Sequence, residues 1–170
     1  LDRETRDPIE ILDEIESILN IRCAPVTWPI GMGPRFKGIY HLGRDQITLF
    51  SHTRGDSIEE NQIIHGLITD DAVSELGDQH EALVNEIELV KGASHDFDLS
   101  EYRDGKLTPV YFGTALRNFG VMEMLDDFVE YAPVPLPRET DIGIVNSTDE
   151  EFSGFIFKIQ ANMDPKHRDR

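Results

Sequence analysis

Two short segments carry residues whose chemistry suits the recognition of a guanine base. The chain starts Leu1-Asp2-Arg3, and Gly113-Thr114-Ala115-Leu116 follows an apolar stretch much further along. A carboxylate such as that of Asp2 can accept two hydrogen bonds from the N–H groups of guanine and thereby reject adenine. A loop of small residues lets a backbone N–H, here that of Ala115, reach the guanine oxygen. Each segment alone is a weak signal, but together they predict the base-binding half of a nucleotide site.

The phosphate-binding half of such a site is not recognisable. Residues 31–38 resemble a phosphate-binding loop only superficially, because Phe36 replaces the second glycine and Gly38 replaces the magnesium-binding Ser or Thr. A hairpin loop with an exposed Lys37 is the simpler interpretation. No Asp-x-x-Gly sequence occurs, so the usual γ-phosphate switch is also missing. Since phosphate contacts dominate nucleotide binding, we expect neither useful GTP affinity nor hydrolysis from this chain alone.

The histidines and acidic residues give little sign of catalysis. None of the six histidines belongs to a His-x-x-x-His or His-Glu-x-x-His pattern, so no metal site is predicted. His95 and Asp98 could form the acid–base pair of a stand-alone hydrolase, and the alternative is a capped helix start at Asp98. The sequence contains no Gly-x-Ser-x-Gly nucleophile elbow.

The composition is that of a globular protein with an acidic surface. Hydrophobic residues make up 39% of the 170 positions, and the net charge is −17. This charge repels phosphate backbones, so direct nucleic-acid binding is not expected. We expect no membrane association, because no apolar run approaches the roughly 20 residues that span a bilayer, and the charged start does not resemble a secretory signal. The single Cys23 is expected to be a buried thiol and weakly favours a reducing, cytoplasmic setting.

The first third of the chain predicts a helix followed by strands. Asp7-Pro8-Ile9-Glu10 combines a capping residue, a proline suited to the first turn and a glutamate that completes a capping box. Asn20 is a plausible stop, and one face of this helix carries Ile9, Leu12, Ile15 and Leu19. Residues 23–30 are predicted as a single strand, and residues 38–42 and 46–50 as a hairpin.

The remainder predicts mostly helices. They cover residues 70–76, 79–90 and 98–103, and the second should bury Ala82, Leu83, Ile87 and Val90. Residues 107–112 are predicted as an apolar strand, followed by the small-residue loop 113–118. A helix after Gly120 should bury a stripe of Val121, Met124, Leu125, Phe128 and Val129. Prolines then begin a stiff linker, and residues 152–160 are predicted as a strand without partners in this chain, which indicates a truncated β domain.

Longer stretches resemble bacterial peptide chain release factor 3, a family of translational GTPases. Residues 1–8 resemble the continuation of an Asn-Lys-Leu-Asp-Arg motif. The other segments that carry the resemblance are residues 23–33, 36–42, 88–94, 111–120 and 152–170. Elongation factor G is similar more loosely, mainly around the Pro-Ile-Gly, Phe-Lys-Gly and small-residue loop segments. The resemblance therefore runs along the whole chain.

This resemblance implies an α/β fold: the C-terminal half of a P-loop-type GTPase domain, an α+β insert and the first strand of a following β-barrel domain. Asp2 would be the guanine-reading carboxylate, with Thr114, Ala115 and Leu116 as the second guanine loop. No catalytic residue or metal ligand carries over, because the phosphate loop, both switches and the catalytic His lie upstream in the family. The implied division is 1–32 with 105–132 for the GTPase half, 33–104 for the insert, 133–151 for a linker and 152–170 for the barrel.

The implied parent is a cytoplasmic GTPase of translation termination that uses GTP with magnesium. It would bind the ribosome after peptide release and drive class-one release factors off it. This chain would supply guanine-recognition elements and an insert, but no phosphate site, and would be inactive and bind no nucleotide alone. The alternative is a non-enzymatic interaction module in which the acidic insert docks a basic ribosomal protein or a release factor.

Overall fold

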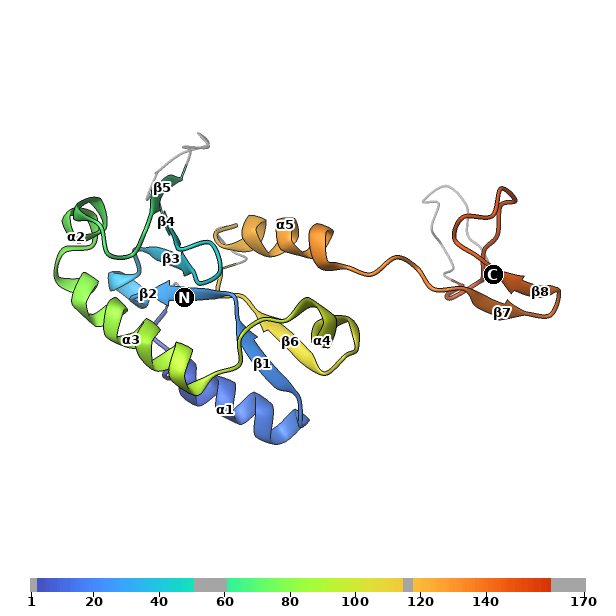
Figure 1. The fold of residues 1–170 in the computed structure, drawn as a ribbon, viewed down its shortest axis with the longest axis horizontal. Helices are drawn as coiled ribbons and strands as arrows, with labels where there is room; N and C mark the ends of the chain where they lie inside the picture. Colours follow the sequence, from blue (N-terminus) through green and yellow to red (C-terminus); the bar gives the residue numbers. More distant parts are fainter. Residues whose placement is uncertain (1–2, 51–60, 115–117, 160–170) are drawn as a thin grey trace, which may run out of the picture. The chain divides into compact units, whose positions relative to one another are not determined.

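The computed structural model describes residues 3–50, 61–114 and 118–159, which fall into two compact units, Leu1–Ala132 and Pro133–Arg170. The first unit is a mixed α/β arrangement (Figure 1). Its helices and strands are α1 (Pro8–Leu19), β1 (Arg22–Pro25), β2 (Thr27–Ile30), β3 (Gly38–His41), β4 (Gln46–Leu49), β5 (Gln62–His65), α2 (Asp70–Leu76), α3 (His80–Ala93), α4 (Leu99–Arg103), β6 (Leu107–Val110) and α5 (Val121–Tyr131). The described residues of this unit also form two short 3-10 helices, η1 (Gly33–Arg35) and η2 (Gly77–Gln79).

Local signals set the ends of α1 as the sequence predicts. The Asp7 carboxylate accepts a hydrogen bond from the backbone N–H of Ile9 at 2.7 Å, which satisfies a donor that a helix start leaves without a partner. Asn20 ends the helix in the left-handed conformation with φ 53°. Leu12 is buried, but Leu19 is 61% exposed, so the predicted apolar face is covered only over its first turns.

Residues 23–30, which were predicted as one strand, are divided between two sheets. The prediction of a single strand is therefore wrong. β1 pairs in parallel with β6, whereas β2 starts an antiparallel sheet of order β2-β3-β4-β5. Val26 lies between them and takes part in both: its N–H donates to Val110 O at 2.9 Å, and its carbonyl accepts from Leu42 N at 2.9 Å. Because β2 belongs to the four-stranded sheet, that sheet starts before the predicted insert boundary at residue 33.

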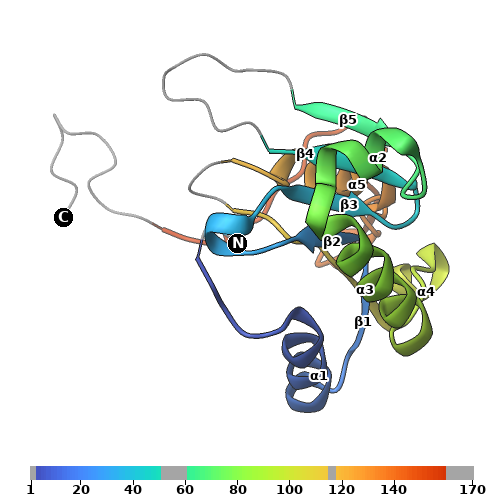
Figure 2. The same cartoon turned by 90° about the vertical axis from the view of Figure 1, so that its left-hand side faces the viewer.

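Helices α2 and α3 cover one face of the four-stranded sheet (Figures 1 and 2). A row of side chains crosses this face in register, and the row consists of Trp28, Tyr40, Ile47 and Ile64. These residues form the main core with Leu76 of α2 and with Leu83, Ile87 and Val90 of α3. Burial of each large apolar side chain stabilises the fold by about 1.5–3 kcal/mol. The helical period in α3 is thus confirmed, except that Ala82 is exposed.

The opposite face of the sheet carries a smaller aromatic cluster. Phe36, Ile39 and Phe119 are its buried members, and the partly buried Phe50 packs against them. The rings of Phe50 and Phe119 lie 4.6 Å apart in an edge-to-face arrangement. Phe119 lies in the segment between β6 and α5, so this cluster holds that segment against the sheet.

The buried stripe predicted for α5 is wrong. Phe128 is 59% exposed and Val129 is 80% exposed, whereas Asp127 is fully buried. The side of α5 turned to the protein carries Glu123, Asp127 and Tyr131, one helical turn apart. The helix therefore attaches through a polar face, and its apolar stripe faces away from the described part of the unit.

The described residues of the second unit, 133–159, form a small hairpin and little other regular structure. β7 (Arg138–Thr140) pairs antiparallel with β8 (Gly143–Val145) inside the segment predicted as a linker. The predicted strand at 152–160 is wrong as far as it is described, since residues 152–159 have no regular secondary structure. No pairing partner for them occurs among the described residues, and strands need a partner for their backbone groups. No helix within these limits is long and apolar enough to cross a bilayer.

Candidate functional site

The loop between β6 and α5 is where the sequence predicts a base-binding site, and its two ends are tied together. Thr114 N donates to Phe119 O at 2.9 Å, and Phe119 N donates to Thr114 O at 3.2 Å. Two glycines flank this bridge and allow it to form. A Cβ on Gly113 would lie 2.7 Å from Phe119 O, and one on Gly120, whose φ is +72°, would lie 2.5 Å from Phe112 O. The backbone therefore closes a short loop directly after β6.

The four predicted guanine-site residues are described only in part. Asp2, Ala115 and Leu116 lie outside the described residues, and Thr114 lies within them. Thr114 is buried, and its backbone N–H is used by Phe119.

A buried polar cluster, which the sequence did not predict, connects the four-stranded sheet to α5. At its centre is the carboxylate of Asp127, which has no exposed side-chain surface. It accepts a hydrogen bond from the Tyr111 hydroxyl at 2.9 Å. It also lies 3.3 Å from Nε2 of His41 and forms an ion pair with Arg44. We call these four residues the Asp127 cluster.

The hydrogen bonds define the protonation of His41. The backbone N–H of Arg44 donates to Nδ1 of His41 at 3.2 Å, so Nδ1 is an acceptor and carries no proton. The remaining proton of the neutral ring is then on Nε2, which donates to Asp127. Burial, and next the nearby Arg44 guanidinium, lower the pKa of His41 below its ordinary 6.5, while Asp127 opposes this shift. Burial and the Asp127 hydrogen bond raise the pKa of the Tyr111 hydroxyl.

This arrangement suits attachment of a helix better than catalysis. The ring nitrogens of His41 and the Tyr111 hydroxyl are committed to hydrogen bonds inside the protein, and no nucleophile stands beside them in the cluster. Arg44, with 38% of its side chain exposed, brings a charge that offsets the buried carboxylate. The cluster explains why α5 stays on the sheet although its apolar residues are exposed.

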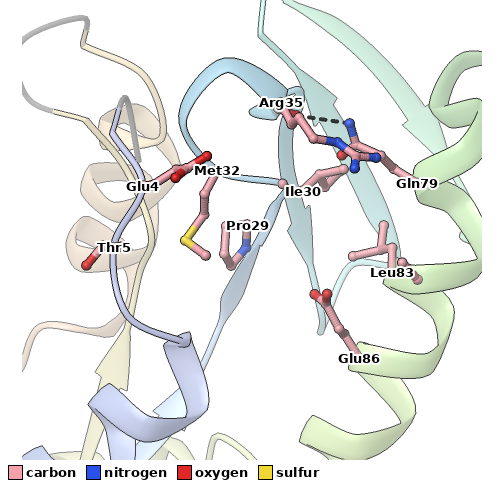
Figure 3. A pocket seen from close by; sticks show the side chains of 11 residues that line it. Glu4, Thr5, Pro29, Ile30, Met32, Arg35, Gln79, Leu83 and Glu86 are labelled. Atoms are coloured by element: carbon pink, nitrogen blue, oxygen red, sulfur yellow. Dashed lines mark hydrogen bonds between the residues drawn. The ribbon is translucent and has the colours of Figure 1, made fainter.

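A cavity of about 400 Å³ lies between the segment before α1, strand β2 and helix α3. Figure 3 shows Met32 and Glu86 on opposite sides of this space, with Glu4 beyond Met32. Oε2 of Glu86 accepts a hydrogen bond from Nε1 of Trp28 at 3.0 Å. The side chain of Arg35 pairs with Asp78 at 2.6 Å. We refer to this space as the β2–α3 cavity.

The other candidate groups take structural roles. Lys37, in the superficial phosphate-loop sequence, donates to the Leu76 carbonyl at 2.7 Å and so caps the end of α2. Asp98 accepts from Glu101 N at 2.8 Å and caps α4, which confirms the capped helix start. Nε2 of His95 lies 3.9 Å from Oε1 of Glu16. In the described ranges, no group of three or more His, Cys, Asp or Glu side chains could hold a metal ion.

Among known proteins, a distant structural likeness is found. No protein-family model matches the sequence. A similar solved structure is the crystal structure of ttk003000868 from Thermus thermophilus, with 14% sequence identity and a TM-score of 0.47. The match covers 76% of this chain and 20% of that chain, so this chain spans about a fifth of that protein's length. A likeness of this strength identifies neither a family nor a function.

Proposed function

We propose that this chain is the C-terminal half of the GTPase domain of a translational GTPase similar to peptide chain release factor 3. The observation that carries the proposal is the parallel pair β1–β6 followed by the loop that Thr114 and Phe119 close. In open α/β sheets, ligands bind beyond the carboxyl ends of parallel strands. A loop closed at that position suits a base-binding loop containing Ala115 and Leu116, and Asp2 would supply the carboxylate.

The two-stranded sheet β1–β6 and the exposed apolar face of α5 support the proposal that this part of the chain belongs to a larger α/β domain. Parallel sheets are normally buried under helices on both faces, and a sheet of only two strands is marginal. Within the described ranges, β1 pairs with β6 and with no further strand of that sheet. The exposed Leu125, Phe128 and Val129 of α5 form an apolar face of the kind that covers such a sheet. Further strands from the same protein would cover this face.

The whole protein would act in translation termination. It would use GTP and magnesium to drive class-one release factors off the ribosome in the cytoplasm, and this chain would contribute base recognition and an insert. The insert would be the four-stranded sheet with α2 and α3. Phosphate and magnesium ligands would come from outside this chain, and the chain alone would therefore neither bind GTP tightly nor hydrolyse it.

The test exchanges the hydrogen-bonding character of Asp2 in the full-length protein. Asp2→Asn replaces a carboxylate oxygen with an NH₂ donor, which pairs with the extra oxygen of xanthine and not with the guanine amino group. We expect GDP affinity to fall by about 100-fold or more and xanthosine diphosphate affinity to rise, as judged with fluorescent nucleotide analogues. Asp7→Asn is the matched control, because Asn caps a helix as well as Asp does.

Two results would overturn the proposal. One is an Asp2→Asn protein that keeps its GDP affinity and gains none for the xanthine nucleotide. The other is saturable micromolar binding of a fluorescent GDP analogue to the 170-residue chain alone, because this would place the phosphate site within it.

The alternative function is that of an interaction module that docks a basic ribosomal protein or a release factor. The net charge of −17 favours it. Co-sedimentation with ribosomes is its test: binding by the longer protein but not by this chain would contradict it.

A further inference from the structure

The lining of the β2–α3 cavity combines an apolar floor with two carboxylates. Pro29, Met32 and Leu83 supply the apolar surface, and Glu4 and Glu86 supply the negative charge. Figure 3 shows the carboxylate of Glu86 directed toward the space in front of β2. Such a surface suits a side chain that is apolar along its length and cationic at its tip, which describes Lys and Arg.

Glu86 is held in place but keeps acceptor capacity. Its Oε2 receives the Trp28 N–H, and Trp28 is buried in the core. An ionised carboxylate has about four lone-pair sites, so Oε1 can accept further donors. The positive group in the cavity wall, Arg35, is already paired with Asp78 at 2.6 Å. The charge of Glu4 and Glu86 thus remains for a ligand from solution.

The net charge of the whole chain favours a cationic ligand. With a net charge of −17, the chain repels nucleic acids and disfavours association with a second copy of itself. The same charge attracts a positively charged ligand. An arginine can form bidentate hydrogen bonds to a carboxylate while its methylene groups lie on apolar side chains.

We propose that the β2–α3 cavity docks an extended basic segment of a protein partner, with an arginine side chain lying across Pro29 and Met32, its guanidinium at the carboxylate of Glu86, and Glu4 adding negative charge beyond Met32. The residues that line this cavity are other than the four predicted to bind the base. The test of the cavity uses no nucleotide, so the two proposals can fail independently.

The experiment titrates the chain with the acetylated, amidated peptide Arg-Leu-Arg-Leu. Trp28, the single tryptophan, reports binding because its indole N–H is bonded to Glu86, and calorimetry gives the dissociation constant. We expect Glu4→Gln and Glu86→Gln each to raise Kd about threefold and the double variant about tenfold. Glu86→Gln keeps an oxygen that can accept the Trp28 hydrogen bond, which protects the fold.

Three matched controls make the result decisive. Glu88→Gln changes the same charge on α3, but Glu88 does not line the cavity, so Kd should change less than about 1.5-fold. A peptide with citrulline in place of arginine keeps the shape without the charge and should bind at least about tenfold more weakly. Spermidine supplies charge without a peptide backbone and should compete poorly.

Four outcomes would overturn the proposal: no binding at millimolar peptide, equal binding of the citrulline peptide, equal loss in Glu88→Gln, or displacement by spermidine at the same concentration as by the peptide. Absence of binding would show that the cavity is not a docking site. Equal binding of the citrulline peptide would show that the arginine charge plays no part. Equal loss in Glu88→Gln would show that the peptide is held only by the general negative charge of the chain. The last would indicate a small polycation as the ligand.

Discussion

Truncation of Asp127 should reveal how α5 is attached. Asp127→Ala removes a fully buried carboxylate and leaves the Tyr111 hydroxyl and the His41 N–H without their acceptor. Breaking a buried ion pair by removing one partner costs about 3–5 kcal/mol. Arg44 is partly exposed and can turn to solvent, so we expect the lower end of this range, about 3 kcal/mol in the free energy of unfolding.

A double-mutant cycle separates the contribution of the Tyr111–Asp127 hydrogen bond from the general effect of removing a side chain. Tyr111→Phe alone deletes a hydrogen bond to a charged group and should cost about 1.5–3 kcal/mol. In the Asp127→Ala background, the same change should cost almost nothing, because the hydroxyl has already lost its acceptor. The expected coupling energy is at least about 1 kcal/mol. Tyr102→Phe on α4 is the matched control and should cost less than about 0.5 kcal/mol.

Urea denaturation monitored by Trp28 fluorescence measures these free energies, since Trp28 is 1% exposed in the native protein. Hydrogen exchange at the α5 amides distinguishes local release of the helix from global unfolding. The proposed attachment would be refuted if Asp127→Ala cost less than about 1 kcal/mol and left α5 protected. Equal costs of Tyr111→Phe in both backgrounds would refute it as well.

Three further predictions concern stability. The pKa of His41 is lowered in the folded state, so below pH 6.5 the unfolded chain binds a proton at His41 more readily than the folded chain does. The free energy of unfolding should therefore fall as the pH drops below 6.5. In urea titrations, His41→Gln should make this pH dependence weaker. Gly120→Ala, at φ +72° and 2.5 Å from a carbonyl oxygen, should lower stability by at least about 2 kcal/mol, whereas Gly92→Ala, with open space around it, should raise it by about 0.5 kcal/mol in thermal melts. Asp7→Ala should cost about 1 kcal/mol by loss of the α1 cap, and Asp7→Asn should cost almost nothing.

Elements set by neighbouring residues were predictable from the sequence. The cap at Asp7, the stop at Asn20 and the hairpin of β3 and β4 all follow from short-range signals. Strand β5 was missed because its sequence, Gln-Ile-Ile-His, places two apolar residues next to each other and shows no alternation of apolar and polar residues. Helix α5 itself was expected from the sequence. The sequence pattern shows which face of the helix is apolar, but which face is buried depends on the elements that pack against the helix.

The Asp127 cluster could not be predicted because its members lie on separate elements. His41 is the last residue of β3, and Arg44 follows it in the turn to β4. Tyr111 follows β6, and Asp127 is the second of two adjacent aspartates on α5. No spacing in the sequence signals that they meet. The base-binding prediction concerns residues that are mostly outside the described ranges, and it stays a prediction.

Val26 is the single residue between strand β1 of the parallel sheet and strand β2 of the antiparallel sheet. This restricts the length of the chain at this point in any sequence with this fold. One residue has two soft backbone dihedrals, and both are held because its N–H and its carbonyl bond to different sheets. An insertion of one residue there would shift Thr27 and Trp28 by one step and turn the indole out of the core. Natural relatives should therefore keep the length of this junction unchanged, even where the surrounding side chains differ.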